Sequence, residues 1–335
     1  MTQVSLTPDW STAVEAVHQS TSVLLIAHVT PDADALGSAL ALGLGIKSLG
    51  KSVAVSVGEP GFTVPESLSF LSGVQLVVAP EHVGQPDLVI SCDTSSDERL
   101  GTLADVLRNA PSSIAIDHHA SFTGFGDIHL VDPQAAATAE LALGLLDRLD
   151  VELTKDIASC LYAGLVTDTG SFKFQGASGD TLRIGARLYD VGIDHSRLAR
   201  LLFDDEPFDA IRMMGLALQN AVLVPQAVSG RGLVYTAISK EERGSLPEIA
   251  MERAIDVLRR TSEAEVAVIF KQGDDGIWKG SMRSKSLINV GKVATALGGG
   301  GHRFAAGYTG TDNLDDMISE LVSTLADAPE LPHAH

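Results

Sequence analysis

The feature that most constrains this chain is the run Ser112–His119, SSIAIDHH, an apolar segment that ends abruptly in one acid and two imidazoles. Ile114–Ile116 has the composition of a short buried strand. Burying ionisable side chains costs free energy unless they are paired or bind a metal. We therefore expect Asp117, His118 and His119 to lie where a strand leaves the core. By itself, the motif is more typical of an ordinary polar strand end, and the other segments of the chain change this interpretation.

Three further apolar segments end in residues of the same kind. Ser22–His28 leads into the loop HVTPDAD, Asp87–Asp93 ends in an acid, and the segment 160–167 precedes Asp168. In an open α/β sheet, ligands collect outside the carboxyl ends of the strands. The sequence therefore predicts one shared site, whose candidate metal ligands are His28, Asp32, Asp34, Asp93, His118 and Asp168.

Strand and helix patterns alternate through the first half of the chain, which predicts a doubly wound, mostly parallel sheet with helices on both faces. Expected strands cover 22–28, 51–57, 75–79, 87–92 and 112–116. Expected helices cover 7–19, 35–49, 103–109, 137–149 and 156–167, the first with Thr7 as N-cap and Pro8 at its first position. We assign residues 1–191 to an N-terminal catalytic domain.

Gly192 and the acidic segment 204–207 interrupt the helical pattern that runs from 183 to 220. We therefore predict a helical linker at 192–208. Strand patterns at 228–238, 264–272 and 276–282, with helix patterns at 249–260 and 289–297, predict a smaller α/β domain over 209–330.

The charge distribution limits the class of ligand. The net charge of the 335 residues is −19, which argues against a protein that binds long duplex nucleic acid through a general positive electrostatic potential. Residues 251–303 nevertheless carry nine Lys or Arg and six Asp or Glu, a local +3 that leaves −22 for the remainder. We therefore expect an anionic ligand to bind to this positively charged segment.

The compartment can be predicted from what the N-terminus and the apolar runs lack. The first residues, MTQVSLTPDW, show no signal-peptide pattern, and no apolar run approaches the roughly 18 residues that span a bilayer. Cys92 and Cys160 lie in apolar segments and are expected to be buried thiols. We expect a soluble cytoplasmic protein without membrane contact.

Six carboxylate and imidazole ligands without a thiolate suit Mn²⁺, and less well Mg²⁺ or Fe²⁺. Six ligands exceed the needs of a single open site. A shared carboxylate can bridge two ions about 3.5 to 4 Å apart, an arrangement that activates water for phosphoester cleavage. The pattern therefore favours two divalent ions.

A second motif lies in the basic segment. The run Gly298–Gly301 is followed by His302 and preceded by Arg283 and Ser284. Such a run is most often a loop after a helix, and it is no P-loop because Lys and Ser or Thr do not follow it. Successive N–H groups beside Arg283 and His302 could also form an anion cradle.

Together these motifs resemble the four motifs of the DHH phosphoesterase superfamily, and the glycine run with Arg283 and Ser284 resembles its DHH-associated C-terminal domain. The likeness spans roughly 20–310. One departure is Ala33, where the family usually has glycine. The resemblance implies a hydrolase of the α/β fold class. It would cleave short nucleotides such as short RNA, 3′-phosphoadenosine-5′-phosphate or cyclic di-AMP to mononucleotides. A homodimer is left open.

The resemblance also implies a role for each residue. His28, Asp32 and Asp93 would hold one ion, and Asp34, Asp93, His118 and Asp168 the other, with Asp93 as the bridge. Asp117 would orient His118, and His119 would contact the scissile phosphate or the leaving oxygen. The nucleotide would be held by Arg283, Ser284, Gly299, Gly300, Gly301 and His302.

Three alternatives remain at this stage. A manganese-dependent inorganic pyrophosphatase would share the four metal motifs, although the glycine run favours a nucleotide ligand. Asp93-Thr94-Ser95 and Asp168-Thr169-Gly170 match the signature of aspartic proteases, but those enzymes are almost all β. A nucleotide sensor without catalysis would not need a complete set of ligands for two ions.

Overall fold

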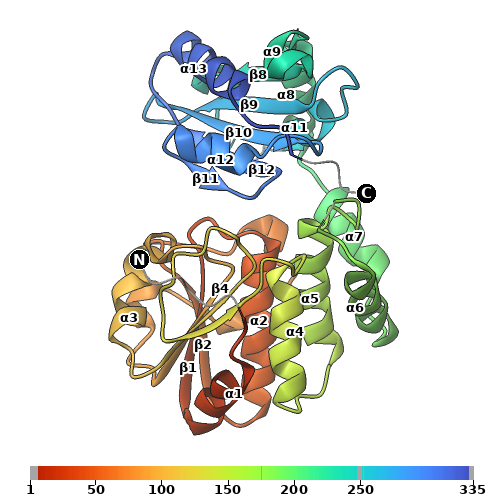
Figure 1. Cartoon of the computed structure of the whole chain (residues 1–335). Helices are drawn as coiled ribbons and strands as arrows, with labels where there is room; N and C mark the ends of the chain where they lie inside the picture. The colour runs from red at the N-terminus through yellow and green to blue at the C-terminus, as the bar shows by residue number, and fades with distance from the viewer. Residues whose placement is uncertain (1–6, 175, 247–250, 252, 332–335) are drawn as a thin grey trace. The chain divides into compact units, whose positions relative to one another are not determined.

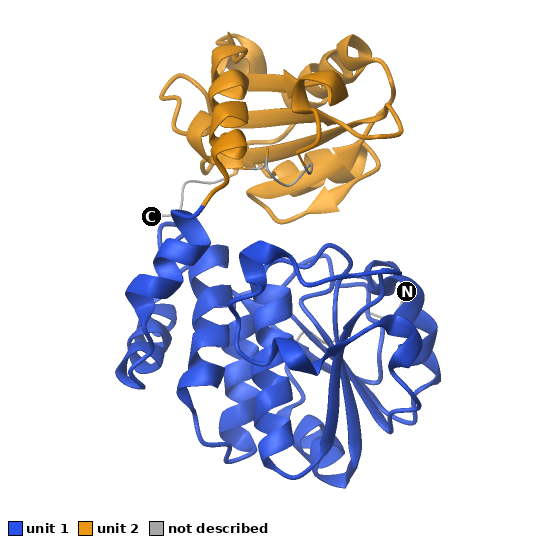
Figure 2. Cartoon of the chain, turned by 180° about the vertical axis from the view of Figure 1, so that it is seen from behind, with its two compact units in different colours: residues 1–205 blue, residues 206–335 orange. Residues whose placement is uncertain are grey.

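The computed structural model describes residues 7–174, 176–246, 251 and 253–331. The chain forms two compact units, Met1–Asp205 and Glu206–His335, each with its own hydrophobic core (Figure 2). The division falls inside the segment that we predicted as a linker, and helix α7 (His195–Phe203) occupies most of that segment.

The first unit is built on a six-stranded parallel sheet with the order β3-β2-β1-β4-β5-β6, which confirms the predicted fold class. Its strand order reverses between β1 and β4, the place where ligands bind in such sheets. An all-β aspartic protease is excluded. The strands are β1 Ser22–Ala27, β2 Ser52–Val57, β3 Val77–Val78, β4 Leu88–Cys92, β5 Ser113–Asp117 and β6 Ile128–Val131.

Alternate residues of the strands supply two cores, because successive side chains point to opposite faces. Leu25 of β1 faces the larger core, and Leu24 and Ile26 face the smaller one, together with residues of η4 and α3.

Figure 1 shows α2, α4 and α5 side by side. The helices are α1 Trp10–Gln19, α2 Ala33–Ser48, α3 Ala104–Asn109, α4 Thr138–Arg148, α5 Lys155–Asp168, α6 Gly179–Asp190 and α7, with 3₁₀ turns η1 Glu66–Leu68, η2 Val74–Leu76, η3 Pro80–His82 and η4 Asp97–Leu103.

Helix α2 is buried along most of its length, which explains its many Ala, Leu and Gly residues. Two glycines let α2 and α5 approach closely. A Cβ atom on Gly37 would lie 2.6 Å from the carbonyl oxygen of Cys160, and one on Gly164 would lie 2.4 Å from Asp34 Oδ1. The contact between the two helices therefore has no room for a methyl group at either position.

The second unit has a mixed sheet with the order β11-β12-β10-β9-β8-β7, in which only β8 and β9 run parallel. Separate clusters of apolar side chains cover its two faces. The strands are β7 Val222–Val224, β8 Leu233–Ile238, β9 Val266–Gln272, β10 Trp278–Ser284, β11 Gly300–Gly301 and β12 Ala305–Thr309, and the helices are α8 Phe208–Gln219, α9 Ala227–Gly230, α10 Lys240–Arg243, α11 Arg253–Leu258, α12 Val290–Ala296 and α13 Leu314–Ala326.

Some element boundaries differ from the predictions. The first helix begins at Trp10 with Asp9 as its cap, so the assignment of Thr7 as N-cap was wrong. The strand predicted from 228 begins at Leu233, because the preceding residues form a turn with left-handed Val228 and Ser229. β6, β7, β12 and α13 were not predicted. Residues 249, 250 and 252 of a predicted helix lie outside the described residues.

No helix within the described ranges combines the length and the apolar character that a bilayer span requires.

We predict that Gly37→Ala lowers the free energy of unfolding of the first unit by about 1–3 kcal/mol, because the added methyl would overlap the backbone of α5. Gly215→Ala is the matched control. Gly215 also lies inside a helix, but a Cβ there meets no atom within 4 Å. The unfolding free energy of the Gly215→Ala protein should stay the same or rise by about 0.5–1 kcal/mol. Calorimetric unfolding of the full chain tests both, and equal effects would contradict the packing argument.

Candidate metal centre

The predicted ligands gather at the carboxyl edge of the parallel sheet. They come from the ends of neighbouring elements: His28 after β1, Asp32 and Asp34 at the start of α2, Asp93 after β4, His118 after β5 and Asp168 at the end of α5. Ligand atoms of His28, Asp32 and Asp93 lie within 4.8 Å of one another, as do those of Asp34, Asp93 and His118. The two groups share Asp93.

Asp93 lies at the centre of the site. Its Oδ2 is 3.8 Å from His28 Nε2, and its Oδ1 is 3.4 Å from His118 Nε2. The two oxygens therefore face opposite sides of the site. The residue has a left-handed backbone with φ of 59°, which is uncommon for a side-chain-bearing residue but tolerated by Asp.

Asp32 has both a structural contact and a contact in the site. Its Oδ1 accepts hydrogen bonds from the backbone N–H groups of Asp34 and Ala35, so it caps α2. Its Oδ2 lies 3.9 Å from His28 Nε2. Ala33 is the first helical residue of α2 and needs no positive φ, so its difference from the family's glycine leaves the loop intact.

Asp34, His118 and Asp168 form the other side of the site. His118 Nε2 is 3.1 Å from Asp168 Oδ2, and its Nδ1 lies 3.2 Å from the carbonyl oxygen of Ala135. A proton on Nδ1, donated to that carbonyl, leaves Nε2 as the ligand atom. Asp34 is completely buried.

The predicted partner of Asp117 was wrong. Asp117 Oδ1 lies 2.6 Å from His119 Nδ1, so this carboxylate orients His119, whereas His118 is held by Ala135. The reason is geometric, because alternate residues of an extended segment point to the same side. His119 Nδ1 is also 3.8 Å from Asp93 Oδ1, which places the ring beside the centre of the site.

The crowding of carboxylates is visible in the pKa values. Burial raises the pKa of Asp34 well above its usual range, and the charges of Asp168 and Asp93 add to this effect. Burial also raises the pKa of Asp168, although His118 opposes the shift. Burial disfavours protonation of His118, but the hydrogen bond and charge of Asp168 outweigh it and raise its pKa. Likewise, burial opposes a charged His119, but Asp117 raises its pKa.

The pKa of Asp32 changes in the opposite direction. Desolvation inside the crowded site tends to raise it, although the side chain is more than half exposed, but the hydrogen bond and charge of His28 lower the pKa below its usual range.

This donor set fits divalent cations. Four carboxylates lie close together, and Asp117 Oδ2 is buried without a hydrogen-bond partner. Bound cations would neutralise these charges. Neither Cys92 nor Cys160 belongs to any metal-type group among the described residues, so the ligands are oxygens and imidazoles. The residues therefore fit two ions that share Asp93.

Sequence reasoning missed two residues of this site. Arg99 Nη2 lies 2.9 Å from His28 Nδ1, and Thr138 contacts both Asp34 and Asp93. Arg99 lies in the 3₁₀ turn η4, which the sequence pattern did not separate from a loop. For Thr138 there was a signal, because it follows the three alanines 135–137, none of which can cap the helix predicted at 137–149.

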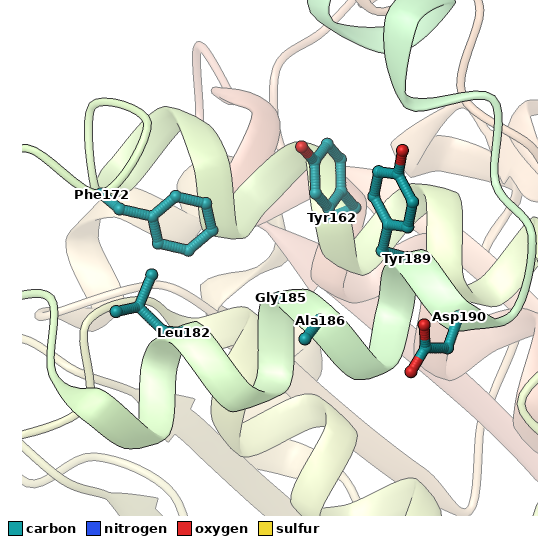
Figure 3. A pocket seen from close by; sticks show the side chains of 7 residues that line it. All are labelled: Tyr162, Phe172, Leu182, Gly185, Ala186, Tyr189 and Asp190. Atoms are coloured by element: carbon teal, nitrogen blue, oxygen red, sulfur yellow. The ribbon is translucent and has the colours of Figure 1, made fainter.

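The chain makes an unusual turn directly after Asp168. Gly170, Ser171 and Phe172 all have φ between 55° and 64°, which is rare for a residue as bulky as Phe. Phe172 and Leu182 lie at one end of a pocket between α5 and α6, whose other end holds Tyr162 (Figure 3). Packing holds Phe172 in place, since a Cβ on Gly185 would lie 2.8 Å from its ring. None of the proposed ligands lines this pocket.

In the second unit, Arg283 and Ser284 differ in what they offer to a ligand. Arg283 lies between Ala267 and Ala305 on neighbouring strands, and burial lowers its pKa while Asp256 opposes the shift. Ser284 is completely buried, and its hydroxyl donates to Glu265 and accepts from the N–H of Ile288. This geometry does not support Ser284 as a direct contact to a nucleotide.

The glycine run is held tightly against β12. A Cβ on Gly299 would lie 2.2 Å from the carbonyl oxygen of Gly307, and one on Gly301 would lie 2.6 Å from Ala306 Cα. The N–H groups of Gly299 and His302 donate to carbonyls of the chain. The predicted cradle therefore lacks the amides of these two residues. Gly300 and Gly301 form the edge strand β11 and pair with Gly307 and Ala306 of β12, so only the groups that face away from β12 are open to a ligand.

We predict that the metal-free protein loses thermal stability as the pH rises above about 6.5, the ordinary pKa of histidine. The pKa values of His118 and His119 are raised in the folded state, so their contribution is complete below the unfolded pKa and is lost as pH rises through the folded one. The raised pKa values of Asp34 and Asp168 give the same sign, beginning above about pH 4.

The measurement is the melting temperature in EDTA across this range. Saturating Mn²⁺ should reduce the decline, because ions would replace protons at the site. Asp168→Asn should flatten it in EDTA, because Asp168 raises the His118 pKa. A metal-free melting temperature that rises with pH would contradict the prediction.

Comparison with known proteins agrees with this geometry. Residues 22–165 match the N-terminal domain of the DHH family, and residues 230–327 match the DHHA1 domain. A relative in Thermus thermophilus, named bifunctional oligoribonuclease and PAP phosphatase NrnA, is 33% identical over 86% of this chain and 83% of its own. Its Bacillus subtilis namesake is 29% identical over 90% and 93%.

Two further matches are more distant. The cyclic-di-AMP phosphodiesterase PdeA of Listeria monocytogenes is 25% identical over 86% of this chain but only 44% of its own length. The crystal structure of an exopolyphosphatase-related protein from Bacteroides fragilis superimposes with a TM-score of 0.85 at 23% identity, covering 94% and 95% of the two chains, which shows a common fold. On these matches, the chain belongs to the DHH family.

Proposed function

We propose that this protein is a metal-dependent phosphoesterase that hydrolyses short nucleotides to mononucleotides. The observation that carries the proposal is the pair of ligand groups that share Asp93. Two hard-ligand sites joined by one carboxylate are the arrangement used to cleave phosphoesters. The names of the relatives support the same reaction class, since they describe an oligoribonuclease, a PAP phosphatase and a cyclic-di-AMP phosphodiesterase.

His28, Asp32 and Asp93 would hold one ion, and Asp34, Asp93, His118 and Asp168 the other. Bound there, the two ions would supply an activated water and neutralise charge on the phosphate. His119 is oriented by Asp117 through its Nδ1, so its other ring nitrogen is presented for the scissile phosphate or the leaving oxygen. We propose Mn²⁺ as the native ion, because imidazole and carboxylate ligands are mixed, with Mg²⁺ as the alternative.

Arg283, Gly300, Gly301 and His302 would hold the remainder of the nucleotide. Arg259 adds positive charge near Arg283. Burial lowers the pKa of Arg259, the charge of Asp256 opposes this shift, and the nearby charge of Arg283 lowers the pKa further. Paired guanidinium groups are well suited to phosphate. Sequence reasoning did not single out Arg259.

The proposal is tested by direct assay of the purified protein with Mn²⁺. Short RNA, 3′-phosphoadenosine-5′-phosphate, cyclic di-AMP and inorganic pyrophosphate should be compared, each with and without EDTA. Release of mononucleotides that EDTA abolishes is expected. Turnover of pyrophosphate alone would point to the pyrophosphatase alternative, and binding of nucleotides without any turnover would point to a sensor.

We predict that Asp93→Asn and His302→Ala impair different steps. Asn keeps the left-handed backbone of residue 93 but removes a negative charge shared by both ions, so kcat should fall at least 1,000-fold, on the order of the loss of a catalytic charge. His302→Ala should mainly raise KM. His82→Ala, at an exposed histidine of η3, should change neither. Equal losses of kcat in both site variants, with an unchanged KM, would contradict this division.

We also predict a preference for substrates of about two to four nucleotides over long single strands, because the local +3 of residues 251–303 neutralises only a few phosphates. Long-strand binders combine a basic groove with aromatic side chains, whereas this chain is acidic and 5% aromatic. The test is kcat/KM for a dinucleotide and a long oligonucleotide at two salt concentrations. Faster cleavage of the long strand, falling steeply with salt, would refute the prediction.

A further inference from the structure

Thr138, the first residue of α4, contacts two of the proposed metal ligands at once. Its backbone N–H donates to Asp34 Oδ2 over 2.6 Å, and its hydroxyl donates to Asp93 Oδ1 over 2.8 Å. Thr138 and Asp34 are completely buried, so water does not compete for these bonds. One residue of α4 therefore joins a ligand from α2 to a ligand that follows β4.

The hydroxyl contact fixes the rotation of the Asp93 carboxylate. Oδ1, which accepts the bond from Thr138, faces His118, whereas Oδ2 faces His28. In this orientation the carboxylate could offer one oxygen to an ion on each side. The terminal torsion of Asp is broad, so a donor on one oxygen is needed to select a single orientation.

The position of Thr138 depends in turn on Asp34. Helix α4 follows Ala137, which has no side-chain oxygen to cap the first amides. The N–H groups of Thr138 and Ala139 donate to the Asp34 carboxylate instead. A negative charge is favoured at this end of a helix. Asp34 thus acts as the missing cap of α4 and sets where the Thr138 hydroxyl lies relative to Asp93.

We propose that Thr138 is a positioning residue of the two-metal site. Its hydroxyl holds Asp93 in the orientation that turns one oxygen toward His28 and the other toward His118, and its amide holds Asp34. The inference rests on the proposed function, because it requires Asp93 to be shared by two bound ions. It predicts that removing the hydroxyl weakens metal binding before any substrate is present.

The experiment is calorimetric titration of the metal-free full chain with Mn²⁺. Thr138→Val keeps the shape of the side chain but removes the donor, and its affinity for at least one ion should fall about 10- to 100-fold. Thr138→Ser keeps a hydroxyl and should recover most of the affinity. If the valine variant does not fold, Thr138→Ala offers the same comparison, since it also lacks the donor.

The matched control is Thr236→Val. Thr236 is another completely buried threonine, and its hydroxyl donates to the carbonyl oxygen of Ala217 over 2.6 Å in the second unit. Its loss should lower stability but leave Mn²⁺ binding unchanged. Equal Mn²⁺ affinity in Thr138→Val and the unaltered protein, or an equal loss in Thr236→Val, would overturn the inference alone. An unaltered protein that binds no divalent ion would overturn the proposed function as well.

Discussion

The rest of the first unit depends on one electrostatic constraint, the gathering of four carboxylates at one edge of a parallel sheet. Asp34 and Asp93 are buried, and the charge of Asp93 raises the pKa of both Asp34 and Asp168. The protein offsets part of this cost with helix amides, the imidazoles of His28 and His118, and the guanidinium of Arg99. Cations would offset the remainder, and this explains why the same residues suit both folding and phosphoester chemistry.

Much of the fold followed from the sequence. Apolar segments that end in acids or histidine predicted β1, β4 and β5 and the edge of the sheet where the ligands meet. Short elements were missed: β6 and β7 have four and three residues, too few for a clear period. The start of α1 was misplaced because Thr7-Pro8 and Asp9 are both good capping signals, and the pattern alone does not choose between them.

The roles of individual side chains were harder to predict, because they depend on contacts between distant segments. The family resemblance implied that Asp117 orients His118, but the direction of the side chains pairs it with His119. Ser284 lies in the segment that resembles the DHH-associated C-terminal domain. Its hydroxyl nevertheless donates a hydrogen bond to Glu265, a residue 19 positions earlier. Thr138 lies 104 positions from Asp34. Such pairings are fixed by packing, and local propensity carries little information about them.

Exposure differs sharply between the two sides of the site. The Asp32 side chain is 57% exposed, whereas Asp168 is 20% exposed and Asp34 is completely buried. An ion held by His28, Asp32 and Asp93 would keep contact with solvent water, and one held beside Asp34 would be largely dehydrated. If both ions bind as proposed, they should therefore exchange at different rates. The protein would carry one replaceable ion and one long-lived ion, and brief dialysis against a chelator would yield a half-loaded form.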